Sequence, residues 1–162
     1  MPKFKGVKII AILCLVAFLF CGCNSFRLSS SIDDLISPIS PSGDNAGVQS
    51  AVDEYCKSGY SIKIPATGNY TTSFILKDID GDKINEAVAF YEPSNKVGTI
   101  SMAVIKKSGE RWSVIANVDG TATDVNSVDF CDFNNDGKLE IIVCWSVVSK
   151  QTGTSINVYS QN

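Results

Sequence analysis

The feature that most constrains the fold of this chain is an internal repeat. Residues 73–91 align without a gap on residues 127–145, which lie 54 positions later in the sequence. The same register continues from residues 99–105 to residues 153–159. The matched acidic pairs are Asp78 with Asp132, Asp82 with Asp136, and Glu86 with Glu140. Because the register spans loops and apolar segments alike, it indicates a repeated unit of about fifty residues that must stack on its neighbour to bury a core.

The apolar segments between the loops have the composition of short β-strands. They are rich in Val, Ile, Phe, Trp and Thr, and clusters of Gly, Asn, Asp, Ser and Pro separate them. Residues 87–90 and 141–145 are apolar on both faces, which indicates sheets that are covered on both sides. We therefore predict an all-β fold with two four-stranded antiparallel propeller-like blades, the first over about residues 70–120 and the second over about residues 124–162.

Two blades form only a partial propeller, because closure typically takes about four or more. The second blade also lacks the fourth strand that residues 111–118 supply to the first, which leaves an exposed sheet edge. Three arrangements resolve this: a short natural form whose helix covers the open sheet, an assembly of several copies, or the N-terminal part of a longer propeller. We expect the last, because the chain stops within a blade.

The N-terminus has the pattern of an export signal. Three lysines within the first eight residues precede an apolar run over residues 9–20. This run is too short to span a bilayer, which needs about 20 residues, and is typical of a secretory signal. The following Gly22-Cys23 resembles the lipobox of bacterial lipoproteins, in which the cysteine is diacylated and becomes the mature N-terminus. The resemblance implies a signal peptide over residues 1–22 and lipidation of Cys23; plain secretion and an uncleaved anchor are the alternatives.

A tether and one helix follow the predicted lipidation site. Residues 23–43 are rich in Ser and contain two prolines, which is typical of a flexible tether. Residues 44–59 predict an amphipathic helix with a cap from Asp44 and an end at Gly59. The residues on its apolar face are Val48, Ala51, Val52 and Tyr55. A helix this short needs a surface to pack on.

Charge and composition exclude several classes of function. The chain has 14 basic and 17 acidic residues, and cleavage of the signal removes three of the basic ones, so no basic excess is available for nucleic acid. It has no histidine, which excludes Ser-His and Cys-His nucleophilic dyads and His-ligated zinc. Three cysteines, Cys56, Cys131 and Cys144, remain after the predicted processing, an odd number that does not suit a full disulfide framework. They are expected to be small buried hydrophobes, or to include one bridge between Cys131 and Cys144.

The two acidic loops have the side-chain pattern of a hard-cation site. Each places oxygen-bearing side chains at its first, third, fifth and ninth positions, and the seventh can add a backbone carbonyl. The candidate ligands are Asp78, Asp80, Asp82, Ile84 and Glu86 in the first loop, and Asp132, Asn134, Asp136, Lys138 and Glu140 in the second. Calcium accepts about six to eight hard oxygens in a tolerant geometry, whereas magnesium demands a stricter octahedron and soft metals ask for sulfur or imidazole. The pattern therefore favours Ca²⁺.

The pattern differs from that of an EF-hand and is similar to a β-propeller motif. An EF-hand ends with glutamate at its twelfth position and lies between helices, but here that position is Ala89 or Val143 and the flanks are strand-like. The loops resemble the FG-GAP or VCBS repeat of integrin-type β-propellers, over about residues 70–160. The resemblance implies that the side chains at the four oxygen positions of both loops are calcium ligands. The alternative is a pair of Asx-type turns whose carboxylates cap backbone amides without metal.

The two loops differ at their sixth position, which is Lys83 in the first and Gly137 in the second. Glycine permits a positive φ there, whereas lysine in that conformation costs about 1 kcal/mol. Gly81, at the fourth position, can absorb part of the bend. We therefore expect the second loop to bind calcium more tightly than the first.

The side chains outside the loops predict no active site. Lys106 and Lys107 are expected to form a solvated strand end. The aromatic residues expected in the blade core, rather than on a ligand platform, are Phe90, Tyr91, Trp112 and Trp145. The carboxylates left in the strand region, which no sequence pattern clusters, are Glu92, Glu110, Asp119, Asp124 and Asp129.

We therefore expect a lipid-anchored, extracytoplasmic module of the bacterial cell envelope that binds calcium and is not an enzyme. FG-GAP domains generally present loops to protein or glycan partners, so the resemblance implies such a partner or a place in an envelope assembly. Self-assembly is a further option. The alternative is part of a larger propeller enzyme acting on carbohydrate, since propellers also host hydrolases and lyases; that chemistry would need a pair of carboxylates that are not calcium ligands.

Overall fold

The computed structural model describes residues 43–120, 122–148 and 152–161, which form one helix and eight strands. The helix, α3, spans Asp44–Tyr55. The strands of the first sheet are β1 (Tyr60–Lys63), β2 (Phe74–Lys77), β3 (Glu86–Pro93), β4 (Ser101–Ser108) and β5 (Arg111–Asp119). The strands of the second sheet are β6 (Asp124–Cys131), β7 (Glu140–Val148) and β8 (Thr152–Tyr159). The predicted signal peptide, Cys23 and all of the predicted tether except Gly43 lie outside the described residues.

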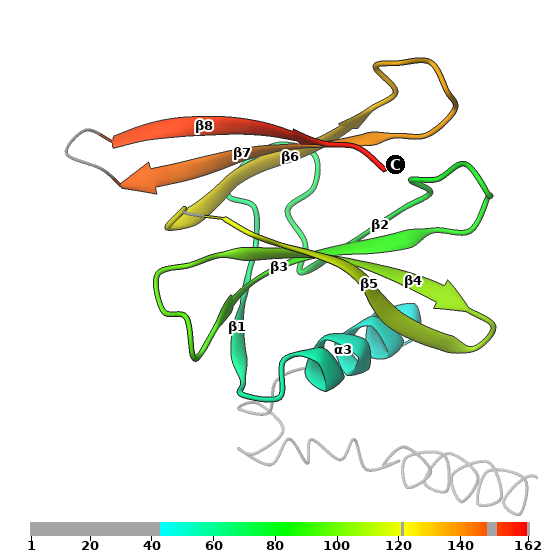
Figure 1. The fold of residues 1–162 in the computed structure, drawn as a ribbon, viewed down its shortest axis with the longest axis horizontal. Helices are drawn as coiled ribbons and strands as arrows, with labels where there is room; N and C mark the ends of the chain where they lie inside the picture. The colour runs from blue at the N-terminus through cyan, green and yellow to red at the C-terminus, as the bar shows by residue number, and fades with distance from the viewer. Residues whose placement is uncertain (1–42, 121, 149–151, 162) are drawn as a thin grey trace, which may run out of the picture. The chain divides into compact units, whose positions relative to one another are not determined.

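Both sheets are antiparallel, and within the described residues neither closes into a barrel (Figure 1). The first sheet has the order β1-β3-β4-β5, and β2 lies on the same edge of β3 as β1. β1 pairs with the C-terminal half of β3 and β2 with its N-terminal half. The second sheet has the order β6-β7-β8. The all-β, partial propeller-like fold is therefore confirmed. The sheets have five and three strands rather than the predicted four each, and β1 is a strand that the sequence pattern had not predicted.

The pairing registers confirm the internal repeat. In the first sheet, Ala87 of β3 lies opposite Ile105 of β4. In the second, Ile141 of β7 lies opposite Tyr159 of β8, and each of these residues is 54 positions later. The same offset relates the pairing of β2 with β3 to that of β6 with β7. A shift of one residue would send every side chain to the other face, so the shared register fixes equivalent surroundings for equivalent residues.

The first sheet lies between the helix and the second sheet (Figure 1). Side chains of a strand point alternately to its two faces. Accordingly, Ala87, Ala89 and Tyr91 of β3 pack in the cluster that contains α3, whereas Val88 and Phe90 pack in the cluster that contains β6 and β7. The apolar character of β3 on both faces follows from this double cover, as predicted.

Within the described residues, the second sheet is buried on one face and only partly covered on the other. Ile141, Val143 and Trp145 of β7 are buried against the first sheet, while Ile142 and Cys144 between them are half-buried. The prediction that this strand is covered on both sides is therefore wrong. The four aromatic residues assigned to the core are all buried, with Phe90 and Trp145 in an edge-to-face contact at a ring-centroid distance of 5.6 Å.

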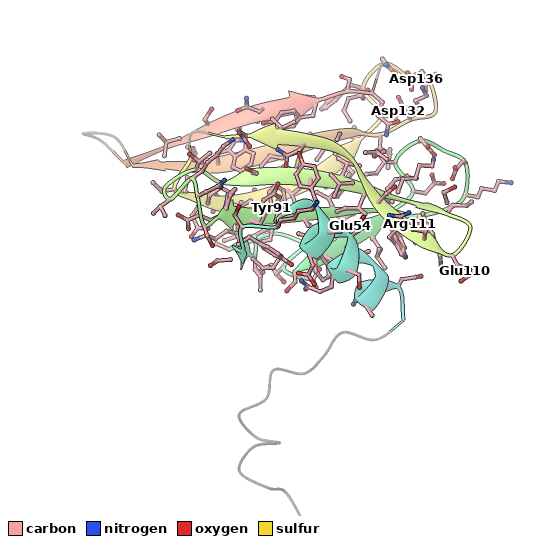
Figure 2. All side chains as sticks on the ribbon, turned by 60° about the horizontal axis from the view of Figure 1, so that its bottom comes forward. Glu54, Tyr91, Glu110, Arg111, Asp132 and Asp136 are labelled. Carbon is pink, nitrogen blue, oxygen red and sulfur yellow. The ribbon has the colours of Figure 1, made fainter. Side chains whose placement is uncertain are left out.

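The helix packs on the first sheet, but its ends differ from the prediction. It ends at Tyr55, whose side chain is exposed, and Gly43 rather than Asp44 stands at its N-cap without a side-chain cap bond. Asp44 instead accepts a hydrogen bond from the Lys107 ammonium at 2.8 Å. A Cβ on Gly47 would lie 2.3 Å from Cδ1 of Trp112, so glycine lets the helix approach β5 closely. Glu54 and Arg111 face each other across this contact at 3.1 Å (Figure 2).

The segment between β1 and β2 joins the two sheets. The backbone N–H groups of Ala66 and Thr67 donate hydrogen bonds to the carbonyls of Val125 and Asn126 in β6, at 3.1 and 2.8 Å. This segment therefore lies along the free edge of β6. At the opposite edge, a groove of about 550 Å³ lies between β4 and β5 of the first sheet and β7 and β8 of the second.

The cysteines of the described residues form no disulfide. Cys56, Cys131 and Cys144 are all free thiols. Cys144 lies opposite Ser127 of β6, four residues before Cys131, which is about 13 Å along a strand and beyond the roughly 7 Å that a disulfide can bridge between Cα atoms. In the part of the chain that the structure describes, no helix has the length and apolar character needed to cross a membrane.

Candidate metal centre

The two acidic loops occupy equivalent places in the two sheets. The first connects β2 to β3, and the second connects β6 to β7. In each, the glutamate at the ninth position, Glu86 or Glu140, is the first residue of the following strand. Both glutamates are buried, with exposed fractions of 1% and 5%. A buried carboxylate at the base of a loop of oxygen side chains requires a partner, because desolvation of an isolated charge is costly.

Matched hydrogen bonds hold both loops in one shape. Glu86 accepts from the N–H of Ile79 at 2.9 Å, and Glu140 accepts from that of Phe133 at 2.8 Å. Four such bonds are equivalent in the two loops. The other three matched donor–acceptor pairs are Lys83 to Asp78 and Gly137 to Asp132, Ile84 to Asp82 and Lys138 to Asp136, and Asp82 to Asp80 and Asp136 to Asn134. The Asx-type turns of the alternative interpretation are therefore present in both loops.

The backbone takes a left-handed conformation at the same two positions of each loop. The fourth and sixth residues have φ values of 78° and 71° in the first loop, at Gly81 and Lys83. They have values of 59° and 86° in the second, at Asn135 and Gly137. Each loop thus has one glycine and one residue with a side chain in this region, where a side chain costs about 1 kcal/mol or more. Lys83 therefore adopts the positive φ that was predicted to be unfavourable for it, even though Gly81 also has a positive φ in the same loop.

The two loops touch each other. The N–H of Leu139 donates a hydrogen bond to the carbonyl of Ile79 at 2.7 Å, which joins the second loop to the first. A Cβ on Gly81 would lie 2.7 Å from the carbonyl oxygen of Gly137, a distance that forbids a side chain there. Both loops lie at the same end of the two sheets, and Asp132 and Asp136 are labelled in the upper one (Figure 2). The repeat therefore forms a joined pair of acidic loops.

A lysine from β4 enters the first loop. The Lys106 ammonium contacts Asp80 closely, Asp82 at 2.9 Å and Glu86 at 3.2 Å. Hydrogen bonds to Asp80 and then to Asp82 raise the pKa of Lys106 above its usual value, and the bond from Lys106 lowers the pKa of Asp82. The prediction that Lys106 belongs to a solvated strand end is therefore wrong. Because alternate residues point to opposite faces, Lys107 instead turns to the helix side, where it lies 5.7 Å from the centre of the Trp112 ring.

The carboxylates of the first loop converge enough to hold a cation. One oxygen each from Asp78, Asp80 and Glu86 lie within 4.8 Å of one another. Their counterparts in the second loop are Asp132, Asn134 and Glu140, so an amide replaces one carboxylate there. Asp136 faces Asn134, whose amide donates to it at 3.0 Å. The N–H of Lys138 and then Asn134 hold the pKa of Asp136 below its usual value, which keeps this carboxylate charged.

Both donor sets suit a hard cation, but the loops differ in how they receive one. The second loop offers two aspartates, an asparagine and a buried glutamate, whose side-chain oxygens are the kind of ligand that Ca²⁺ prefers. The first offers four carboxylates, but three of them contact the Lys106 ammonium. Ile84 and Lys138 have no side-chain oxygen to offer a cation. Their predicted contribution is the backbone carbonyl at the seventh position of each loop.

The carboxylates outside the loops are engaged elsewhere. Glu92 accepts from the N–H of Gly98 at 2.6 Å and pairs with Lys63 at 3.0 Å. Asp119 pairs with Lys96 and accepts from the hydroxyl of Ser101 at 2.7 Å. Glu110 lies at the turn between β4 and β5 (Figure 2). The remaining two, Asp124 and Asp129, belong to β6 and are exposed.

Two packed antiparallel sheets with the same loop at the same place define a repeat module of the β-propeller type. Residues 78–143, from the first acidic loop into β7, match the family model described as FG-GAP-like repeat. This match confirms, over these residues, the FG-GAP resemblance predicted from the loops. Neither a search of curated proteins nor a search of solved structures returned a match.

Proposed function

We propose that the protein is a lipid-anchored, extracytoplasmic, calcium-binding FG-GAP-like module with a non-catalytic role in binding a protein or glycan or in envelope assembly. The observation that carries the calcium part is the second acidic loop. Its oxygen side chains are arranged as in the first loop, its glutamate is buried, and its backbone is held by four matched hydrogen bonds. The residues that would hold the ion are Asp132, Asn134, Asp136, Glu140 and the carbonyl of Lys138.

Bound calcium would supply positive charge at the junction of the two sheets. The second loop contacts the first through Leu139 and Gly137, so fixing its conformation also fixes the position of β7 relative to β3. A ligand that binds only the folded state stabilises that state in proportion to the logarithm of its concentration. The proposed role of the ion is therefore structural.

The carboxylates outside the loops support a non-catalytic role. A glycosidase acid needs a raised pKa, close to the working pH. The pKa of Glu92 is instead lowered, first by the N–H of Gly98 and then by Lys63. That of Asp119 is lowered as well, first by Lys96 and then by Ser101. Both side chains are thus charged groups of ion pairs.

The groove between β5 and β8 supports a role in association. Apolar side chains line most of it, and Ile115 and Val158 at its rim are 56% and 52% exposed. β8 pairs on one side with β7 and is the last strand of its sheet. Light scattering of the full chain tests self-association at this edge. We expect Val158→Glu to lower the association state, and an unchanged state would place the partner surface elsewhere.

The anchoring part of the proposal rests on the sequence around Cys23. Mass spectrometry of the mature protein should show a diacylated N-terminal cysteine. Cys23→Ser should abolish this modification and release the protein from the membrane fraction. A membrane-bound, unmodified Cys23→Ser protein would indicate an uncleaved anchor instead.

Calorimetry of the full chain in mild detergent tests calcium binding. We expect Ca²⁺ to bind with a measurable heat and to raise the melting temperature above that in EDTA. Glu140→Gln, which keeps the shape of the side chain but removes its charge, should lose most of the effect. Absence of both heat and a thermal shift in the wild-type protein would contradict the proposal.

A further inference from the structure

We propose that Lys106 is a built-in cation that occupies the metal position of the first loop, so that calcium binds at the second loop alone. The inference rests on the proposed calcium chemistry of these loops. It makes the two members of the repeat functionally unequal: one loop carries its positive charge in the chain, and the other takes it from solution.

The Lys106 ammonium group lies where several carboxylates of the first loop converge. Lys106 reaches three carboxylates, those of Asp80, Asp82 and Glu86, which come from different positions of the loop. Asp80 and Glu86 belong to the cluster whose oxygens converge within 4.8 Å. A single lysine on a surface pairs with one partner or none, at little gain. Convergence of three carboxylates on one ammonium is instead the arrangement that a bound cation would have.

Glu86 is a buried carboxylate at the base of the first loop. Its side chain is 1% exposed, and its Oε2 atom accepts a hydrogen bond from Ile79. Its Oε1 atom is buried without a hydrogen-bond partner among the described residues, and the Lys106 ammonium lies 3.2 Å away from it. An uncompensated buried carboxylate is strongly unfavourable, so this oxygen requires a cation. Lys106 supplies it.

The two repeats differ at two positions that bear on the charge of the loop. Position three of the loop is Asp80 in the first repeat and Asn134 in the second. Lys106 lies one residue beyond the last pair of β3 with β4, Ala87 with Ile105, and its counterpart Ser160 lies one residue beyond the equivalent pair of β7 with β8, Ile141 with Tyr159. The extra carboxylate and the lysine therefore occur together and are absent together. From the first repeat to the second, one negative charge and one positive charge are lost together. This is expected if the Lys106 ammonium neutralises the additional carboxylate of the first loop.

Lysine and calcium cannot share the first loop. A calcium ion lies about 2.3–2.6 Å from its oxygen ligands, close to the place of an ammonium that contacts the same oxygens. Two cations at such a separation repel each other strongly in a partly buried site. Calcium would have to displace Lys106 from three carboxylates, whereas the neutral Ser160 stands at the equivalent position of the second repeat.

The test is the number of calcium ions bound per chain, measured by equilibrium dialysis with metal analysis on the full chain in mild detergent. We expect one ion for the wild type and two for Lys106→Ser, which gives the first repeat the residue that the second repeat has at this position. Lys107→Ser is the matched control, because Lys107 points to the helix side, and it should leave the number at one. Circular dichroism establishes that each variant is folded.

Two double variants allow the proposal to be tested even if Lys106→Ser does not fold. Asp80→Asn combined with Lys106→Ser gives the first loop the composition of the second at both positions and should also bind two ions. Asn134→Asp combined with Ser160→Lys transfers the lysine arrangement to the second loop and should bind none. Binding of two ions by the wild type, or no added ion in either folded Lys106 variant, would overturn the role of Lys106.

The same measurement separates the two proposals. The wild-type number tests the proposed function, which fails if no ion binds. The difference between the Lys106 variants and the wild type tests Lys106. If the wild type binds no ion and Lys106→Ser binds one, the proposed function is wrong while Lys106 remains the group that keeps calcium out of the first loop.

Discussion

The first and second acidic loops share a backbone but differ in the charge that faces them. Three of the four carboxylates of the first loop contact an ammonium group from β4, whereas the second loop has three carboxylates and one amide, and its repeat has Ser160 in place of that lysine. Hydrogen bonds, φ values and strand registers match closely. The comparison teaches that a repeated loop keeps its shape through backbone amides, while its facing strand decides where the neutralising charge comes from.

Removal of the glutamate at the ninth position should cause the largest loss of stability, and the loss should differ between the two loops. In EDTA, Glu86→Ala should destabilise the fold by about 3 kcal/mol, because the buried N–H of Ile79 loses its acceptor and Lys106 loses a partner. Glu140→Ala should cost only about 1–2 kcal/mol, since Phe133 is exposed and its N–H can bond to water. Urea unfolding measures both values. Equal losses would mean that the loops are energetically equivalent.

The glycines of the loops provide the next comparison. Gly81→Ala should cost about 2–3 kcal/mol, since its Cβ would meet the carbonyl of Gly137 at 2.7 Å at a φ of 78°. Gly137→Ala should cost only about 1 kcal/mol, because open space surrounds its Cβ and only the φ of 86° opposes it. Thermal unfolding in EDTA gives both numbers. A reversed order would show that the loops do not touch in solution.

Acid should weaken the first repeat through Glu92, for which the second repeat has the non-titrating Ser146. The N–H of Gly98, and then Lys63, lower the pKa of folded Glu92 below its ordinary value of 4.5. A lowered folded pKa stabilises the fold above the unfolded pKa, and this stability is lost as the pH falls through the folded pKa. We expect the urea midpoint to fall below about pH 4.5 and Glu92→Gln to flatten that fall. An unchanged pH profile in the variant would remove Glu92 from the acid response.

The ion pair between Lys107 and Asp44 should have the smallest effect. Lys107 corresponds to the neutral Gln161 in the second repeat, and its pair with Asp44 at 2.8 Å is largely exposed. Asp44→Asn should lower stability by about 0.5 kcal/mol or less, and high salt should abolish the difference from the wild type. Thermal unfolding at two salt concentrations checks this. A larger, salt-independent loss would indicate that Asp44 holds the helix end in another way.

Much of the fold could be predicted because it depends on patterns that repeat along the chain. The 54-residue register carried information about both faces of the strands, and the structure reproduces it in the pairing of β3 with β4 and β7 with β8. The strand β1 was missed, because four residues ahead of Pro65 carry little pattern. The face on which a sheet is left uncovered depends on where the helix packs, so the exposure of β7 could not be predicted.

The ligand positions of the loops could also be predicted, but the partner of the first loop could not. Lys106 and Lys107 are adjacent in the sequence and look alike, yet the pleat sends them to opposite faces of the first sheet. The comparison of Asp80 with Asn134 and of Lys106 with Ser160 was available in the aligned repeats. The comparison could be interpreted as an ion pair only once the distance between the loop and β4 was known, and the structure provides that distance.

The hydrogen bond between the loops makes a single amide a reporter on both. Leu139 N–H can exchange with deuterium only when its bond to the Ile79 carbonyl opens. A ligand that holds the second loop therefore slows exchange at a bond whose acceptor belongs to the first loop. Protection of this one amide measures the mechanical coupling of the two halves of the repeat, independently of how many ions either loop holds.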